Sequence, residues 1–175
     1  MNAAVAPALL IAEDDPDDLM LLMRAISAVA PRLTCASVRD GVALGAFLAE
    51  ASVPPKVVLL DLNMPRMDGR EFLAQQRCRR PAAVVPAFIV LTTSAEPADR
   101  ARVLAEGASG YFIKPSSVSA LTEMMRSVVQ QWIPEALMTC APPARRCSVP
   151  APTMAPSSVL LCPQAARLPW VRPSP

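Results

Sequence analysis

The chain has 175 residues, enough for one domain with a sizeable hydrophobic core and too few for two ordinary domains. Its 17 basic and 15 acidic residues nearly balance, and it contains no histidine. This composition excludes imidazole catalysis by the chain itself and a histidine-containing zinc site, and residues 1–133 lack the basic excess of a nucleic-acid interface.

The N-terminal segment shows no targeting signal. It has no basic region before its first apolar stretch, and acids follow directly after residue 12. No apolar run approaches the roughly 18 to 20 residues that span a bilayer. The five cysteines form no CxxC pair, which is typical of reduced thiols. We therefore expect a cytoplasmic protein without a membrane segment.

The first predicted elements are a short strand and a long helix. Residues 9–12 are expected to form the strand, and residues 17–30 the helix, with Asp15 as its N-cap. Asp17 and Asp18 favour the positive end of the helix dipole, and we expect both to be solvated.

A second strand and helix are expected over residues 33–37 and 40–50. The helix offers apolar side chains to a core, namely Val42, Leu44, Phe47 and Leu48. Residues 57–60 are apolar at every position, which is typical of a central parallel strand that is buried on both faces.

The pattern of strand and helix continues to residue 132. The remaining expected elements are a helix over 69–79, a strand over 88–91, a helix over 98–106, a strand over 111–113 and a helix over 117–132. Gly107 is expected to end the fourth helix. Five β-α units in sequence predict an α/β protein with a doubly wound parallel sheet.

Residues 134–175 differ in composition from the rest. After residue 134 they contain nine prolines and no glycine, and four arginines against one acid. Residues 159–162 form their one apolar run, which is too short to build a core. We expect one folded domain over 1–133 and a tail over 134–175 that is largely disordered or loosely docked.

Charged side chains directly follow three of the expected strands. Glu13 and Asp14 follow the first, Asp61 ends the third, and Lys114 follows the fifth. Because the carboxyl ends of parallel strands lie side by side, we expect these groups to converge on one small site. Clustered carboxylates bind a divalent cation, and one of them can accept a phosphoryl group whose charge a lysine can hold.

Motifs at these strand ends resemble the receiver domain of two-component response regulators. They are Glu13-Asp14, Asp-Leu-Asn-Met-Pro-Arg-Met-Asp-Gly over 61–69, Thr92, and Gly-Ala-Ser-Gly-Tyr-Phe-Ile-Lys-Pro over 107–115. The resemblance covers about residues 8–132 and implies a flavodoxin-like sheet of five strands in the order 2-1-3-4-5. Two of the motifs resemble those of small single-domain regulators that are paired with phytochrome-type and other hybrid kinases. They are Glu-Asp-Asp-Pro over 13–16 and Leu-Thr-Thr-Ser over 91–94.

The resemblance implies that Asp61 is the phosphoacceptor and that the site binds Mg²⁺. Asp14 and Asp61 would supply carboxylate ligands, Asn63 its backbone carbonyl, and Glu13 a contact through water. For Asp61 alone, capping of the next turn is the alternative.

Three further residues receive roles from the resemblance. Lys114 would contact the phosphoryl oxygens, aimed by a cis bond to Pro115. Thr92 would donate its hydroxyl to a phosphoryl oxygen, with Thr93 as the competing candidate. Tyr111 corresponds to an aromatic switch that turns inward, or is an ordinary half-buried strand residue.

We therefore predict a stand-alone receiver that is not an enzyme. A sensor histidine kinase would phosphorylate it with Mg²⁺, and the surface of helix four, strand five and helix five would then bind a downstream protein, a phosphotransfer partner or a second copy. Nothing after residue 133 resembles a helix-turn-helix, so no DNA binding is expected.

Two other functions remain open at this point. A non-phosphorylated adaptor could keep only the receiver fold, although the complete set of Asp14, Asp61, Thr92 and Lys114 argues against it. An aspartyl-nucleophile phosphatase of the haloacid-dehalogenase type expects an acid two residues after the nucleophile, where this chain has Asn63.

Overall fold

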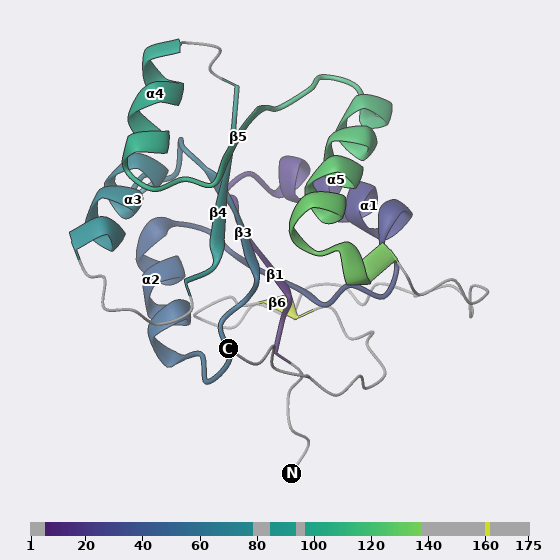
Figure 1. The fold of residues 1–175 in the computed structure, drawn as a ribbon, viewed down its shortest axis with the longest axis horizontal. Coiled ribbons are helices and arrows are strands. Elements are labelled where there is room, and N and C mark those ends of the chain that lie inside the picture. Colours follow the sequence, from purple (N-terminus) through teal and green to yellow (C-terminus); the bar gives the residue numbers. More distant parts are fainter. Residues whose placement is uncertain (1–5, 79–84, 94–96, 138–159, 162–175) are drawn as a thin grey trace.

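The computed structural model describes residues 6–78, 85–93, 97–137 and 160–161. Within them, one sheet has the strand order β5-β4-β3-β1-β2-β6 (Figure 1). The strands are β1 Leu9–Ala12, β2 Cys35–Val38, β3 Val57–Asp61, β4 Ala87–Thr92, β5 Gly110–Ile113 and β6 Leu160–Leu161. The helices are α1 Pro16–Val29, α2 Gly41–Glu50, α3 Gly69–Cys78, α4 Pro97–Ala105 and α5 Val118–Trp132, followed by a 3-10 turn, η1, Pro134–Leu137.

The first five strands pair in parallel, which confirms the predicted fold class and the order 2-1-3-4-5. Helices cover both faces of this sheet: α1 and α5 lie on one face, and α2, α3 and α4 on the other (Figure 1). Every residue of β1 and β3 is buried, as expected for central parallel strands.

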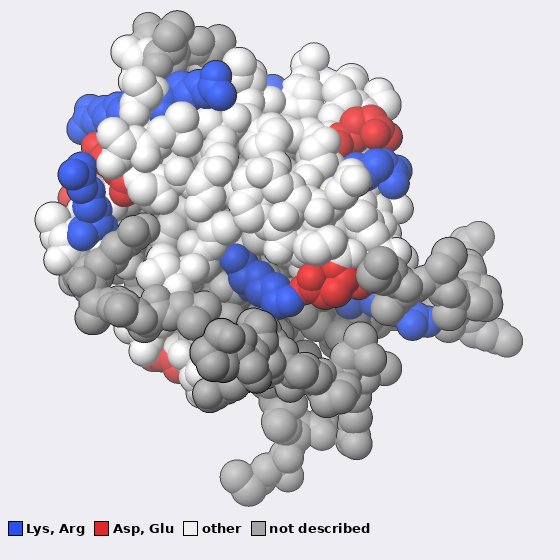
Figure 2. Space-filling model, in the orientation of Figure 1, with Lys and Arg blue, Asp and Glu red and all other residues white. Residues whose placement is uncertain are grey.

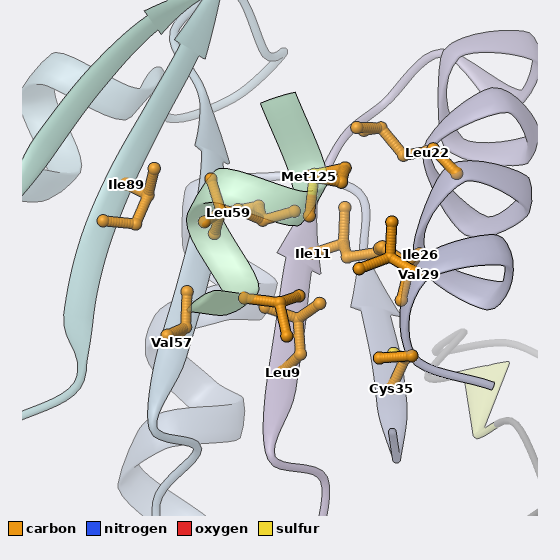
Figure 3. Close-up of a cluster of buried hydrophobic side chains, with 14 of the residues drawn as sticks. Leu9, Ile11, Leu22, Ile26, Val29, Cys35, Val57, Leu59, Ile89 and Met125 are labelled. Atoms are coloured by element: carbon orange, nitrogen blue, oxygen red, sulfur yellow. The ribbon is translucent and has the colours of Figure 1, made fainter. Parts of the chain in front are cut away.

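The alternation of side chains along the strands divides the core into two clusters. Leu9 and Ile11 of β1 pack with α1 and α5, as Figure 3 shows, whereas Leu10 and Ala12 point to the opposite face. Burying each large aliphatic side chain contributes about 1.5–3 kcal/mol, so both clusters hold the central strands in register. The β1–β3 register pairs Ala12 with Leu60, and it thereby places the residues after them side by side.

Local capping residues begin the helices near the site. Asp15 caps α1 as predicted, because its Oδ1 accepts hydrogen bonds from the backbone N–H groups of Asp17 at 2.8 Å and Asp18 at 3.2 Å. Ser117 caps α5 by accepting from the N–H of Ala120. Gly107, two residues beyond α4, has a φ of 106°, in keeping with its predicted role at the helix end.

Some details differ from the sequence-based expectations. The second strand covers Cys35–Val38 rather than 33–37. Val42 does not face the core, because its side chain is 50% exposed, whereas Leu44 is buried. No helix among the described residues is long and apolar enough to cross a membrane.

The C-terminal part of the described chain adds two features to the sheet and core. Ala136 and Leu137 of η1 pack against the cluster of α1 and α5, and Glu135 forms an ion pair with Lys56. The two-residue strand β6 pairs with β2 in antiparallel orientation and makes the sheet six-stranded. Most of the expected tail, residues 138–159 and 162–175, lies outside the described residues.

Candidate functional site

Three carboxylates meet at the carboxyl end of the central strands. Glu13 follows β1, Asp14 precedes α1, and Asp61 is the last residue of β3. One oxygen from each of the three lies within 4.8 Å of the others. Glu13 is 2% exposed and Asp61 6% exposed, while Asp14 is only partly buried. The sheet therefore brings together the acids that the sequence placed at the two strand ends.

Backbone contacts fix the orientation of these acids. The N–H of Asn63 donates to Asp61 Oδ2 at 3.2 Å, and the N–H of Asp15 donates to Glu13 Oε1 at 3.4 Å. Gly69 packs against the main chain of Asp61, where an added Cβ would overlap its carbonyl oxygen and lie 3.1 Å from Leu62 Cα. The loop after β3 thus folds back tightly on the end of its own strand.

A second anchor ties this loop to the start of α2. Asp40 is fully buried, and its carboxylate both caps α2 at the N–H of Ala43 and pairs with Arg66. The N–H of Gly41 donates to the carbonyl of Met67 at 3.1 Å. Arg66 has a φ of 65°, unusual for a residue other than glycine, and the ion pair with buried Asp40 helps to hold it there. Sequence reasoning did not identify this anchor.

Lys114 brings the positive charge into the site. Its Nζ lies 2.7 Å from Glu13 Oε2 and 3.4 Å from Asp61 Oδ1, and its side chain is 12% exposed. The Lys114–Pro115 bond is trans, so the expected cis bond is wrong, in line with the ordinary preference of X-Pro bonds. The backbone N–H of Lys114 donates to the carbonyl of Thr92 at 2.7 Å, which links the ends of β4 and β5.

Asp18 is a member of this charge group that sequence reasoning missed. It was expected to be solvated, but its Oδ2 lies 2.8 Å from Lys114 Nζ. The sequence carries no separate signal for this contact, because Asp18 lies in the first turn of α1, where the helix dipole already accounts for an acid. Asp17 is exposed, as expected.

Burial and the neighbouring charges both shift the pKa values of the groups in the site. Burial raises the pKa of Glu13 to about 7, although the hydrogen bond and charge of Lys114 act in the opposite direction. Burial also raises the pKa of Asp61, against the lowering effect of Lys114. For Lys114, burial acts to lower the pKa, but hydrogen bonds to Asp18 and Glu13 outweigh it and raise the pKa above its usual range.

This arrangement fits a divalent cation. Oxygen ligands from carboxylates are those that Mg²⁺ prefers, and the three acids surround one small region. The raised pKa of Glu13 indicates that Lys114 alone does not compensate the buried negative charge. A cation among the three carboxylates would supply the missing positive charge.

The remaining predicted residues lie close to this edge. Thr92 ends β4 and is fully buried, whereas Thr93 is exposed, so the sequence order that favoured Thr92 matches their burial. Tyr111 is half-buried on β5 and packs against the cluster of α2 and α3. Asn63 is exposed, and its backbone N–H contacts Asp61 as described above.

The fold and site define a class of protein. A family model for the response regulator receiver domain matches residues 9–126, well over half of the chain. The chain belongs to this family.

Individual relatives are similar along most of their length. The chain is 30% identical over 130 residues to response regulator Rcp1 of Synechocystis, covering 71% of this chain and 88% of Rcp1. It is 31% identical over 129 residues to the probable methanogenesis regulatory protein FilR2 of Methanothrix harundinacea, covering 71% and 83%.

Solved structures extend the similarity to the fold. The phosphorylated cyanobacterial phytochrome response regulator RcpA matches with a TM-score of 0.65 and 27% identity over 79% of this chain and all of RcpA. The Mn²⁺-bound form of Rcp1 matches with a TM-score of 0.64 and 29% identity over the same shares. These matches confirm the predicted family and the predicted resemblance of this chain to phytochrome-associated regulators.

Proposed function

We propose that this chain is a signalling receiver whose Asp61 accepts a phosphoryl group from a sensor histidine kinase. The supporting observation is the arrangement at the sheet edge, where three carboxylates lie within 4.8 Å and Lys114 Nζ lies 3.4 Å from Asp61 Oδ1. Membership of the receiver family supports a histidine kinase as donor. The similarity to RcpA, named a phytochrome response regulator, supports a phytochrome-type or hybrid kinase.

In this proposal Asp61 is the nucleophile. One of its oxygens forms the new O–P bond in line with the N–P bond of a phosphohistidine, which breaks as the imidazole leaves with a proton. A Mg²⁺ held by Asp14, Asp61 and the Asn63 carbonyl, with Glu13 acting through water, would neutralise charge on the phosphoryl oxygens. The chain itself contributes positioning and fixed charge, since Lys114 is already next to Asp61.

Thr92 and Tyr111 would carry the change to the surface. The Thr92 hydroxyl would donate to a phosphoryl oxygen, and Tyr111 on the neighbouring strand would move inward. The α4, β5 and α5 surface would then bind its partner or a second copy. Figure 2 shows few charged side chains in the middle of this face, and three exposed apolar side chains come from its elements: Leu104, Ile113 and Val118. Sedimentation with and without a phosphodonor would test whether a second copy binds.

We infer a switch rather than an enzyme. Phosphorylation would shift a population between two conformations, by the difference in stabilisation that it gives to each. A phosphatase mechanism of the haloacid-dehalogenase type would need a general acid at position 63, and the asparagine there cannot supply one.

Labelling by a small phosphodonor tests the proposal. We expect acetyl phosphate with Mg²⁺ to give an adduct that is stable to acid and labile to base, because an acyl phosphate forms on Asp61. Asp61→Asn should abolish it. Asp68→Asn is the matched control, since Asp68 lies in the same loop and caps α3 through the N–H of Glu71, which an asparagine can still do.

Two results would contradict the proposal. Wild-type protein that stays unlabelled would support the adaptor function instead. Steady hydrolysis of many equivalents of acetyl phosphate per protein molecule would support a phosphatase.

A further inference from the structure

The contacts of Lys114 are unevenly divided among its acidic neighbours. Its Nζ makes short contacts with Glu13 at 2.7 Å and Asp18 at 2.8 Å, and a longer one with Asp61 at 3.4 Å. The ammonium group is therefore drawn towards α1 rather than centred on the proposed phosphoacceptor. Glu13 and Asp61 belong, with Asp14, to the three carboxylates that lie within 4.8 Å of one another, and Asp18 does not.

The position of Asp18 is set by the helix that carries it. Asp15 caps the first turn of α1 through the N–H groups of Asp17 and Asp18, and Leu22 and Ile26 of the same helix are buried in the core. Asp18 thus approaches Lys114 from a fixed backbone. Its side chain is 41% exposed, whereas that of Glu13 is 2% exposed.

We propose that Asp18 is a positioning residue that holds the Lys114 ammonium on the α1 side of the site while Asp61 is unphosphorylated. Without Asp18, the nearest anions to the ammonium would be Glu13 and Asp61, both of which are proposed to serve the cation. Lys114 already contacts Glu13 at 2.7 Å, and it would then compete more strongly with Mg²⁺ for both carboxylates. A phosphoryl group on Asp61 would later compete with Asp18 for the same ammonium. This inference rests on the proposed function.

Magnesium affinity of the unphosphorylated full chain tests the inference by calorimetry. Asp18→Asn should weaken Mg²⁺ binding by about 3- to 10-fold, the size expected for contacting charged groups. Asp17→Asn removes the same charge from the same turn at an exposed position. We expect less than about a 2-fold change there, from screened long-range charge alone.

A double-mutant cycle shows whether Asp18 acts through the lysine. Lys114→Met should tighten Mg²⁺ binding, and in that background Asp18→Asn and Asp17→Asn should have equal effects. If Asp18→Asn still weakens binding more than Asp17→Asn, Asp18 acts on the cation directly and the inference is wrong. Equal effects of the two variants in the wild-type background would also overturn it, as would a wild type that binds no Mg²⁺.

A second readout separates positioning from general damage. At saturating Mg²⁺ and a fixed concentration of acetyl phosphate, Asp18→Asn should increase the phosphorylated fraction, because Lys114 is released towards the phosphoryl group. Thermal unfolding would check that the variant is folded, and a folded variant with a lowered fraction would contradict the inference. The calorimetry needs no phosphodonor, so unlabelled wild-type protein that follows the predicted Mg²⁺ pattern would refute the proposed function alone.

Discussion

Glu13 places a carboxylate in almost complete burial, and its ionisation should therefore depend on pH in the neutral range. In the folded chain it keeps a proton up to about pH 7, whereas its ordinary pKa is 4.5. The folded state binds more protons than the unfolded state between these values. Its contribution to stability is therefore fully present below about pH 4.5 and is lost as the pH rises through 7.

We predict that without divalent cations the free energy of unfolding falls between pH 5 and pH 8. The shift of Glu13 corresponds to about 3 kcal/mol, and the raised pKa of Asp61 acts in the same direction. Urea unfolding in EDTA would measure this decrease, and Glu13→Gln should reduce it. Glu71→Gln, at an exposed position on α3, is the matched control and should leave the pH dependence unchanged. A flat profile for the wild type would contradict the prediction.

At the scale of single residues, strand position predicted the acids and the lysine but not their full set of contacts. Glu13, Asp61 and Lys114 could be placed together because parallel strand ends converge. Asp18 could not, because an acid in the first turn of a helix is explained equally well by the dipole. Its partner lies 96 residues away, and that contact depends on the packing of α1 beside the sheet.

Among the secondary-structure elements, two helical glycines differ in the space available for an added methyl group. Gly69, at the start of α3, packs against the main chain of Asp61 and Leu62, so an added methyl group would push the loop away from β3. Gly45, inside α2, has room for a methyl group, because the nearest atom to it, Phe72 Cε2, would lie at an ordinary contact distance of 3.9 Å.

We therefore predict opposite effects of the same substitution. Gly69→Ala should destabilise the protein by about 1–3 kcal/mol through overpacking and should weaken Mg²⁺ binding, because the end of β3 must shift. Gly45→Ala should stabilise it by about 0.5–1 kcal/mol, the usual difference within a helix, with Mg²⁺ affinity unchanged. Denaturant unfolding and calorimetry would measure both. A tolerated Gly69→Ala would show that the loop is less tightly held than described.

The elements themselves were predictable where the pattern was unambiguous. The apolar runs of β1, β3 and β4 identified buried strands, and Asp15 identified the start of α1. The side of α2 that faces the core was harder to predict, because apolar residues occur around most of that helix and the periodicity does not select one side. Val42 was therefore placed wrongly, and only packing of α2 against the sheet resolves its position.

For the whole molecule, the core extends slightly past the expected boundary of the domain. The first 133 residues were predicted to form the receiver, but Ala136 and Leu137 pack against the core and Glu135 pairs with Lys56. The strand β6 adds only two residues to the edge of β2. A pairing between residues so far apart in sequence leaves no local signal, so it could not be predicted.

We predict that a chain ending after residue 137 keeps one cooperative unfolding transition and the Mg²⁺ affinity of the full chain. A few edge hydrogen bonds, each worth about 0.5–1.5 kcal/mol, would be lost with β6. A chain ending after residue 133 should lose about a further 1–3 kcal/mol, since the packing of Leu137 is removed. Thermal and denaturant unfolding of the two chains would measure this. Failure of the longer one to fold would assign later residues to the core.

The charged groups of the site lie far apart along the chain. Lys114 meets Glu13 across 101 residues, and Asp61 comes from the strand between them. A chain still emerging from the ribosome could expose Asp61 long before residue 114 was made. Such an unfinished copy would lack the lysine and the strand before it, so the charge group of Glu13, Asp61 and Lys114 can assemble only in chains that extend past residue 114.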